Sequence, residues 1–305
     1  GLGDVYKRQV FEEAGFPKGI FNVVTNGPGF SVEVGDELIE HPKVRRLSFT
    51  GSTEVGRQIA EKAARHLKKV TLELGGIDPL IVLKDADIDY AVNAATFGRF
   101  NHQGQICMSS KRIIVEKPLA THFTEKFVKK VQRLKVGDPQ DPDTVIGPLI
   151  NQEQVDKLHK QVEEAIKNGA RLVCGGKYDG RCYYPTVLTN VTPDMNIARE
   201  ETFGPVAPII IVEDADEAVR VANDTRFGLS AGVITSDFQK GLEIAERLES
   251  GMVHINDSSV HDEPQVPFGG MKESGYGRHG GRAAIEEFTE LRWISIQRTP
   301  RQYPF

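Results

Sequence analysis

The chain has few cysteines and no long hydrophobic run. Its 305 residues include three cysteines, Cys107, Cys174 and Cys182, which are too few and too irregularly spaced for a disulfide framework or a zinc site. No segment approaches the ~18 apolar residues that a membrane-spanning helix needs, and no amino-terminal segment resembles a secretion signal. We therefore expect reduced thiols and a cytoplasmic location.

An excess of positive charge is also lacking. Lysine and arginine number 38 against 43 acidic residues, which gives a formal net charge of -5 and a pI near 6.0. This balance indicates neither a nucleic acid nor an anionic membrane as partner. The length is sufficient for two domains at roughly 100–200 residues each.

An initiator methionine is lacking too, because the chain begins with GLGDVYKRQ. Residues 10–15 are typical of the end of a helix that is already under way. We expect a fragment of a longer protein, in which residues 1–9 are foreign sequence or disordered.

Helical and extended patterns alternate along the chain, which predicts an α/β protein with mainly parallel strands. Gly75 and Gly76 follow an apolar strand and favour a domain boundary near residue 76. We expect strands at residues 21–25, 45–51, 70–74, 79–83, 208–212, 231–235 and 252–256. We expect helices at residues 32–39, 52–66, from a cap at Asp85 or Asp87 to 95, at 123–134, 152–168, 216–223 and 238–248.

Cys107 lies in FNHQGQICMSSKR, where Gly104 and the surrounding polar residues favour a tight loop. A free thiol has a pKa of about 8.5, and nearby backbone dipoles or a positively charged cofactor ring would lower that pKa and favour the nucleophilic thiolate. The alternative for any single cysteine is a small buried hydrophobe, which is how we interpret Cys174 and Cys182.

Glu73 lies in VTLELGG, at the end of an apolar strand and directly before a glycine pair. Partial desolvation would raise the pKa of this carboxyl, and such a group can act as a general base near neutral pH. The alternative is a solvated residue at a strand end.

Two further segments suggest a nucleotide. In SFTGSTEVGRQIA a strand, a glycine turn and a helix start follow one another, so Ser52 and the first N–H groups of the helix could hold a phosphate. The spacing is not GxGxxG, which makes this segment weak by itself. In EETFGPV, one of two acids could accept hydrogen bonds from ribose hydroxyls while Phe203 packs on a flat ligand; a surface turn with a buried Phe is the alternative.

Five motifs in order, FTGSTEVG, LELGG, FNHQGQICMSSKR, EETFGPV and PFGGMKESGYGRHGG, resemble the aldehyde dehydrogenase superfamily from about Phe16 to the carboxyl end. The resemblance implies an aldehyde dehydrogenase-like α/β fold. Its parts would be the second part of a Rossmann-type NAD(P)-binding domain (10–75), a complete catalytic domain (76–275) and a segment that returns to the NAD-binding and oligomerisation region (276–305).

The resemblance also implies NAD- or NADP-dependent oxidation of a small aldehyde to the carboxylic acid, without a metal. Cys107 matches the family's nucleophile, and Glu73 matches the base that activates water to hydrolyse the thioester. The positions implied for the cofactor are Gly51, Ser52, Gly56, Leu74 beside the nicotinamide, Glu201 in preference to Glu200, and Phe203.

Two segments narrow the implied substrate. VHDEPQVPFGG and EEFTELRWISIQRTPRQYPF are similar to bacterial aromatic aldehyde dehydrogenases, the vanillin, benzaldehyde and salicylaldehyde group. The residues that would line the aldehyde tunnel are Asn101, Ile106, Met108, Phe268 and the loop 258–266. The alternative is that these side chains only pack the loops.

The chain departs from the family pattern in two respects. Ile77 replaces a lysine that many members carry, outside the chemical step. The family's earlier region, with the asparagine of the oxyanion hole, the lysine that binds the adenosine ribose and one oligomerisation strand, has no counterpart in this sequence. We expect an active full-length protein and little or no dehydrogenase activity from this chain, since one oxyanion donor alone is worth ~10²–10³ in rate. The choice between NAD and NADP stays open.

Other readings remain. A CoA-acylating or phosphorylating relative would use the same cysteine, a dehydrogenase for aliphatic aldehydes or semialdehydes would share the mechanism, and a catalytically silent member would serve as a binding or structural protein. A cysteine hydrolase would need a histidine partner, and His102 has no evident orienting acid. The family implies a homodimer or homotetramer, in which the tail 292–305 would reach a neighbouring subunit.

Overall fold

The structure is a computed structural model that describes residues 2–27 and 29–305, with side chains from residue 5 onward. The chain divides into two compact units. Unit 1 comprises Gly1–Leu47 and Gln58–Lys69, and unit 2 comprises Ser48–Arg57 and Val70–Phe305. The domain boundary expected near residue 76 stays a prediction.

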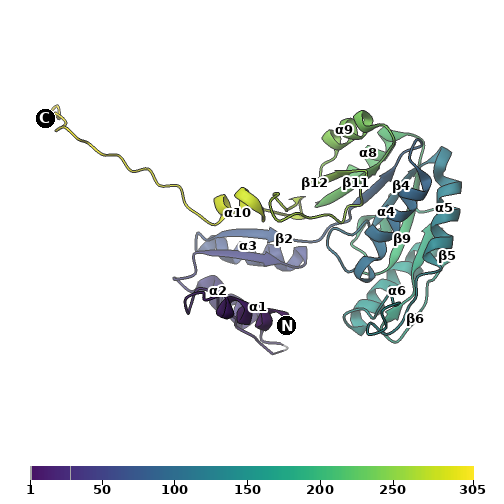
Figure 1. The fold of residues 1–305 in the computed structure, drawn as a ribbon, viewed down its shortest axis with the longest axis horizontal. Coiled ribbons are helices and arrows are strands. Elements are labelled where there is room, and N and C mark those ends of the chain that lie inside the picture. The colour runs from purple at the N-terminus through teal and green to yellow at the C-terminus, as the bar shows by residue number, and fades with distance from the viewer. Residues whose placement is uncertain (1, 28) are drawn as a thin grey trace. The chain divides into compact units, whose positions relative to one another are not determined.

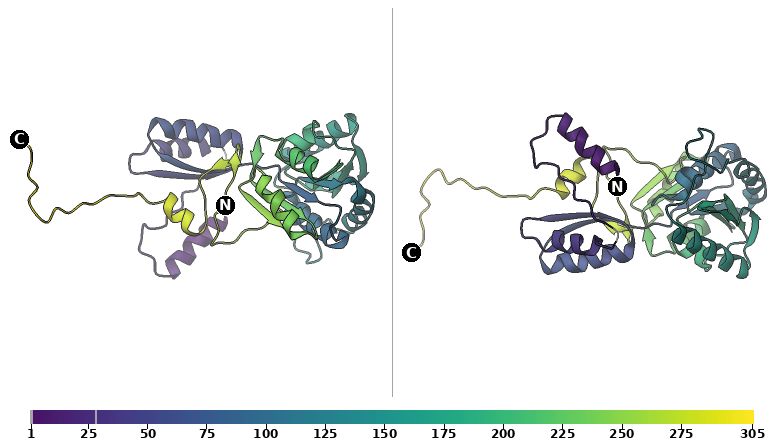
Figure 2. Two further views of the ribbon diagram at one scale, coloured as in Figure 1. Left: turned by 90° about the horizontal axis from the view of Figure 1, so that it is seen from above. Right: turned by 90° about the horizontal axis from the view of Figure 1, so that it is seen from below.

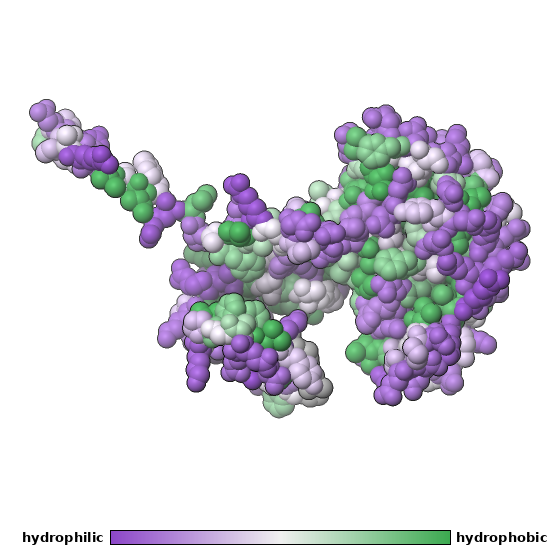
Figure 3. Space-filling model, in the orientation of Figure 1, coloured by the Kyte–Doolittle hydropathy of each residue, from purple (hydrophilic) through white to green (hydrophobic). Residues whose placement is uncertain are grey.

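Unit 1 holds the helices α1 (Leu2–Glu13) and α2 (Ser31–Glu40) and most of α3 (Thr53–Arg65). Residues 2–9 are helical here, and the expectation that residues 1–9 are foreign or disordered stays a prediction. The Asp36 carboxylate forms a 2.5 Å ion pair with the Lys62 ammonium, which connects α2 to α3. Hydrophobic residues gather over α1 and α2 on the face shown in Figure 3.

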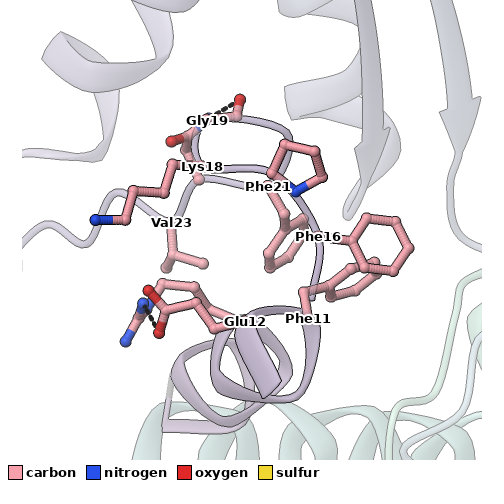
Figure 4. A pocket seen from close by; sticks show the side chains of 10 residues that line it. Phe11, Glu12, Phe16, Lys18, Gly19, Phe21 and Val23 are labelled. Atoms are coloured by element: carbon pink, nitrogen blue, oxygen red, sulfur yellow. Dashed lines mark hydrogen bonds and ion pairs between the residues drawn. The ribbon is translucent and has the colours of Figure 1, made fainter. Parts of the chain in front are cut away.

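The strand predicted at residues 21–25 is wrong, because the structure has no strand there. The ring of Phe21 instead stacks on Phe11 at 4.7 Å between centroids, and Phe16 meets Phe11 edge-on at 4.9 Å. These rings border a cavity of about 300 Å³ (Figure 4). The apolar character of the segment is therefore used in packing on α1, and none of the predicted site residues lines this cavity.

Unit 2 is built on a seven-stranded sheet in the order β12-β11-β3-β4-β9-β8-β5 (Figure 1). All neighbours are parallel except β5 and β8, which pair antiparallel at one edge. Strands buried on both faces are expected to be continuously apolar, as IIV in β4 and PIIIV in β9 are. The bounds are β3 (Pro79–Val82), β4 (Arg112–Glu116), β5 (Arg171–Cys174), β8 (Thr186–Thr189), β9 (Val206–Val212), β11 (Ser230–Ile234) and β12 (Met252–Ile255).

Helices cover both faces of this sheet (Figure 2). Alternate residues of a strand point to opposite faces: Leu80 and Val82 join the core under α4 (Ile88–Phe100) and α5 (Lys117–Val131). Ile81 joins the core on the other face, under α6 (Gln152–Lys167), α8 (Ala215–Asn223) and α9 (Phe238–Arg247).

A three-stranded sheet in the order β1-β2-β14 carries Glu73 at a strand end. Its strands are β1 (Arg46–Thr50), β2 (Lys69–Glu73) and β14 (Gly275–Tyr276). β2 and β14 are antiparallel, so Glu73 lies opposite Gly275 in the register. The remaining elements are the 3-10 helix η1 (Asn101–Gly104), α7 (Asn196–Arg199), α10 (Gly281–Glu287), the pair β10 (Phe227–Gly228) and β13 (Met271–Lys272), and the hairpin β6 (Tyr178–Asp179) with β7 (Cys182–Tyr183).

The other predicted helices and strands are confirmed. Their bounds agree within a few residues, except those of the helices α4 and α5. Asp87 caps α4 by accepting from Tyr90 N–H, and Asn151 caps α6 in the same way. α5 begins at Lys117, six residues earlier than expected, and the strands β4, β5 and β8 were not predicted. Within the part of the chain that is described, no helix is long and apolar enough to cross a membrane.

Candidate active site

Cys107 lies in a turn shortly after η1, which confirms the predicted loop. Three successive residues adopt the left-handed backbone conformation, His102 at φ 50°, Gln103 at φ 57° and Gly104 at φ 70°. Only a glycine fits at the third position, because a β-carbon on Gly104 would lie 2.6 Å from the carbonyl oxygen of Gly204. This sharp reversal ends α4 and presents the nucleophile segment as a loop.

Arg99, at the end of α4, holds this loop in place. Its guanidinium is fully buried and donates to the hydroxyl of Ser109 at 2.8 Å, to the carbonyl of Thr202 at 3.0 Å and to the carbonyl of Val206 at 2.5 Å. It also donates to the carbonyl of Gly204. One side chain thus joins the nucleophile segment to the EETFGPV turn.

Burial raises the pKa of the Cys107 thiol to about 11. Desolvation is the main cause, and the carboxylates of Asp78 and Glu201 raise the pKa further, whereas the Lys111 ammonium and the Met108 backbone N–H lower it. The expected lowering of this pKa is therefore wrong for the chain alone. The loss of solvation destabilises the thiolate more than the nearby backbone dipoles stabilise it.

Glu73 ends β2 and is 5% exposed. Among the described residues, neither of its carboxylate oxygens has a hydrogen-bond partner. Burial raises the pKa of this carboxyl to about 7, with Arg278 opposing the increase and Asp262 adding to it. A β-carbon on Gly269 would lie 2.9 Å from Glu73 Oε1, so the PFGG motif leaves room for the carboxylate. The expected rise in the Glu73 pKa is confirmed.

Gly75 and Gly76 follow Glu73, the candidate base, and approach the loop of Cys107, the candidate nucleophile. A β-carbon on Gly76 would lie 2.9 Å from the carbonyl oxygen of Cys107 and 2.6 Å from Asp78 Oδ2. On Gly75 it would lie 2.9 Å from Glu201 Oε2. The glycine pair after Glu73 thus allows the nucleophile loop and the EETFGPV turn to approach the end of β2.

The residues expected at the cofactor phosphates lie at the start of α3. The hydroxyl of Ser52 accepts from Val55 N–H at 3.3 Å, and the Ser52 carbonyl accepts from Gly56 N–H at 2.9 Å. Ser52 therefore begins the helix, directly after the Gly51 turn. The first N–H groups of a helix point outward and carry a partial positive charge, which suits an anion.

Leu74 and Gly56 are in direct contact. A β-carbon on Gly56 would lie 2.4 Å from Leu74 Cδ2, so only a glycine lets α3 pack this closely on the end of β2. Leu74 is buried and donates its backbone N–H to Ser274 at 3.0 Å. The roles of both residues toward a cofactor stay predictions.

Glu201 faces a pocket of about 280 Å³ within unit 2. Its Oε1 accepts from Gly76 N–H at 3.3 Å, and its side chain is still 26% exposed. Phe203 follows in the same turn, half-buried, and its carbonyl accepts from Gln154 at 2.9 Å. The pocket is lined by Ser52, Thr53, Glu54, Lys157, Gln161, Glu164, Asn196, Glu200, Glu201, Arg226 and Phe227.

Glu200 belongs to a different contact from Glu201. It forms a 2.8 Å ion pair with Arg226, whose other nitrogen pairs with Glu273 at 2.8 Å. Glu201 is engaged as well, by the Lys111 ammonium at 3.4 Å, so the preference for Glu201 over Glu200 as a ribose ligand stays a prediction.

The four residues predicted to line an aldehyde tunnel fall into two places. Asn101 is exposed at the start of η1, while Ile106 and Met108 flank the thiol and are half-buried. The Met108 carbonyl accepts from the hydroxyl of Ser259 at 2.7 Å, which attaches the loop 258–266 to the nucleophile turn. Phe268 lies after that loop and pairs with His279. Their contact with a substrate remains a prediction.

Two charged residues of this site were not singled out from the sequence. Asp78 and Lys111 are 2% and 0% exposed, and their side chains lie 3.6 Å apart. The available signal was an acid directly before the apolar strand β3 and a lysine directly before β4. Across the described residues, no cluster of three or more histidine, cysteine or acidic side chains has a placement that could hold a metal ion.

The fold and these motifs agree with comparisons to known proteins. Residues 5–294 match the aldehyde dehydrogenase family, so the chain belongs to that family. It is similar to benzaldehyde dehydrogenase YfmT of Bacillus subtilis strain 168, with 52% identity over 297 residues, which cover 97% of this chain and 61% of that protein. It is also similar to a vanillin dehydrogenase of Pseudomonas fluorescens, with 47% identity and coverage of 97% and 61%.

A solved structure gives the same result. The salicylaldehyde dehydrogenase of Pseudomonas putida G7, complexed with salicylaldehyde, has a TM-score of 0.95 and 48% identity, covering 98% of this chain and 62% of that chain. The predicted fold class and family are therefore confirmed. The chain spans about 61% of the length of the curated relatives it matches.

Proposed function

We propose that the whole protein oxidises aromatic aldehydes to carboxylic acids with NAD or NADP, through a thioester on Cys107. The observation that carries the proposal is the pairing of two groups across the Gly75–Gly76 turn. Glu73 has no hydrogen-bond partner among the described residues, and its pKa is raised to about 7. Cys107 lies in the loop that approaches Gly76, three residues after Glu73.

The first step is attack of the Cys107 thiolate on the carbonyl carbon of the aldehyde. A sulfur–carbon bond forms and the carbonyl π electrons move to oxygen, which gives a thiohemiacetal oxyanion. The backbone N–H of Cys107 is the donor that family resemblance assigns to this oxyanion, a kind of contact typically worth ~10²–10³ in rate. The half-buried loop limits the access of water to the thiol, which also slows uncontrolled hydrolysis of the thioester.

The second step that this chain performs is hydrolysis of the thioester. Water attacks the acyl carbon, its proton passes to the Glu73 carboxylate, and the Cys107 thiolate leaves. A carboxyl with a pKa of about 7 is about half ionised at neutral pH and is well matched to accept this proton. Hydrolysis, rather than transfer to CoA or phosphate, follows from such a base, and identification of the product tests the distinction.

The residues present fit a dinucleotide. The start of α3 offers N–H groups to a diphosphate, the pocket contains the cations Lys157 and Arg226, and the partly exposed Glu201 is an acceptor for ribose hydroxyls. NAD or NADP, when bound, accepts the hydride that converts the thiohemiacetal to the thioester. Aldehyde dehydrogenases use either cofactor, and the choice stays open for this protein.

The preference for an aromatic aldehyde is supported by the relatives, which are named for benzaldehyde, vanillin and salicylaldehyde. Ile106 and Met108 provide apolar and polarisable side chains beside the thiol, which suit a flat ring. The test is NAD(P)H formation by the whole protein with benzaldehyde, vanillin and salicylaldehyde against hexanal and succinate semialdehyde. A kcat/KM that favours the aliphatic substrates contradicts the aromatic assignment.

A homodimer or homotetramer is proposed for the whole protein. The tail that follows α10 has neither helix nor strand, and it exposes Trp293, Ile294 and Ile296. Apolar side chains in an exposed, extended segment are suited to pairing with another subunit. Light scattering after size-exclusion chromatography measures the assembly; a monomer at micromolar concentration contradicts it. The expected cytoplasmic location stays a prediction.

A further inference from the structure

Lys111 is fully buried four residues after the nucleophile. Lysine is almost never fully buried unless it is paired, because removing an ammonium from water is costly. An aliphatic side chain at the same buried position would avoid that cost. A specific set of partners must therefore hold the charge at this position.

The partners of the Lys111 ammonium are the backbone of the nucleophile turn itself. Its Nζ donates to the carbonyl of Cys107 at 2.5 Å and to the carbonyl of Ile106 at 3.0 Å. Hydrogen bonds from a charged donor are about twice as strong as neutral ones. Lys111 thus fixes the turn at Cys107, which carries the thiol, and at Ile106, the residue before it.

Two carboxylates from separate segments complete the surroundings of the ammonium. Glu201 Oε1 lies 3.4 Å from Nζ and Asp78 Oδ2 lies 3.6 Å from it. Asp78 is itself fixed, because its Oδ1 accepts from Ser230 N–H at 2.5 Å. The ammonium therefore joins the nucleophile turn to β11 through Asp78 and to the EETFGPV turn through Glu201.

We propose that Lys111 is a positioning residue for the nucleophile, holding the carbonyl of Cys107 and the carboxylate of Glu201 from one buried point. The proposal rests on the proposed function only in taking Cys107 as the nucleophile and Glu201 as a cofactor contact. Ile106 and Cys107 cannot turn their carbonyls toward the substrate side while Lys111 binds both.

The charge of Lys111 has a second consequence. The groups that act on the thiol are the Lys111 ammonium and the Met108 N–H, which favour the thiolate, and the carboxylates of Asp78 and Glu201, which oppose it. Removing the cation and removing one of the anions should therefore change thiol reactivity in opposite directions. A residue that merely supported the fold would not produce opposite signs.

The test is the rate of Cys107 alkylation by iodoacetamide as a function of pH, which needs neither aldehyde nor cofactor. Cys174 and Cys182 are replaced by serine throughout, so that one thiol remains. For Lys111→Met we expect an apparent thiol pKa higher by about one, and hence alkylation about tenfold slower at a pH of about 8. For Asp78→Asn, which keeps the shape of the side chain, we expect faster alkylation.

The control is Lys117→Met, which makes the same change in an exposed 2.7 Å pair with Glu213 and should leave the pH profile unchanged. Circular dichroism and thermal unfolding check each fold. If Lys111→Met does not fold, Lys111→Arg and Asp78→Asn still decide, because the retained cation predicts a smaller effect than that of Asp78→Asn. A wild-type profile for folded Lys111→Met, a larger effect for Lys111→Arg than for Asp78→Asn, or the same direction of change for Lys111→Met and Asp78→Asn overturns the proposal.

The two proposals fail separately. Alkylation that depends on Lys111 in a protein that oxidises no aldehyde would remove the proposed function and leave the positioning role. Aldehyde oxidation by the whole protein, together with alkylation that ignores Lys111, would do the reverse.

Discussion

The backbone N–H of Gly51 donates a 3.1 Å hydrogen bond to the carbonyl oxygen of Glu73. The residue that begins the turn before α3 is thereby fixed to the residue that carries the candidate base. Because the bond uses main-chain atoms, it leaves the Glu73 carboxylate free to face Gly269. A cofactor held at the start of α3 and a water activated by Glu73 would thus both be positioned by the end of β2.

Glu73→Gln should uncouple formation of the acyl-enzyme from its hydrolysis. The amide keeps the volume of the side chain and cannot take a proton from water. With p-nitrophenyl acetate as an activated ester, we expect a burst of nitrophenolate and then a steady rate lower by about 10²–10⁴. Mass spectrometry should show acetyl on Cys107. Glu213→Gln, in an exposed ion pair, is the control, and an unchanged steady rate in Glu73→Gln would contradict the role.

The pH dependence of thioester hydrolysis should follow the ionisation of Glu73. Its pKa is raised to about 7, and only the ionised form accepts a proton. The rate at which pre-formed acetyl-enzyme is hydrolysed should therefore rise with pH, reach half its plateau near a pH of about 7 and fall about tenfold for each pH step below it. An inflection that persists in Glu73→Gln would assign the titration to another group.

Gly76→Ala should destabilise unit 2. The new methyl group would lie 2.6 Å from Asp78 Oδ2 and 2.9 Å from the Cys107 carbonyl oxygen, and both neighbours are held by Lys111. Overpacking of this kind typically costs about 1–3 kcal/mol. Urea unfolding measures the change. Gly137→Ala, whose methyl would make only a 3.4 Å contact with Thr144, should stay within about 0.5 kcal/mol of the parent chain.

Arg99→Met should cost more than any surface arginine. The substitution leaves the carbonyls of Thr202 and Val206 buried without the Arg99 donor, whereas Gly204 keeps the N–H of Val206, and each unsatisfied buried group costs about 1–3 kcal/mol. We expect a loss of about 3 kcal/mol or more in the free energy of unfolding, measured by urea titration. Arg220→Met, on the exposed face of α8, should change it by less than about 1 kcal/mol. Equal effects would show that the Arg99 contacts contribute little.

Much of the architecture was predictable because its determinants are local. Asn151 and Asp87 are cap residues followed by helical patterns, and PIIIV reads as a buried strand whatever surrounds it. The strand expected at residues 21–25 was wrong because an apolar segment specifies burial and not the partner, and Phe21 found Phe11. β4 escaped prediction because polar residues, KR, directly precede its short apolar run.

The sequence by itself determined the family and singled out the proposed nucleophile and base, since these rest on residue type and on the order of motifs, which folding does not alter. Only the tertiary structure decided the electrostatics. Whether Glu73 is desolvated, whether the Cys107 pKa lies above or below that of a free thiol, and which charges face it depend on segments that are distant in the chain. Lys111 shows the difference: four residues from Cys107 it reads as a surface lysine, yet the meeting of Asp78 and Glu201 around it makes its burial possible.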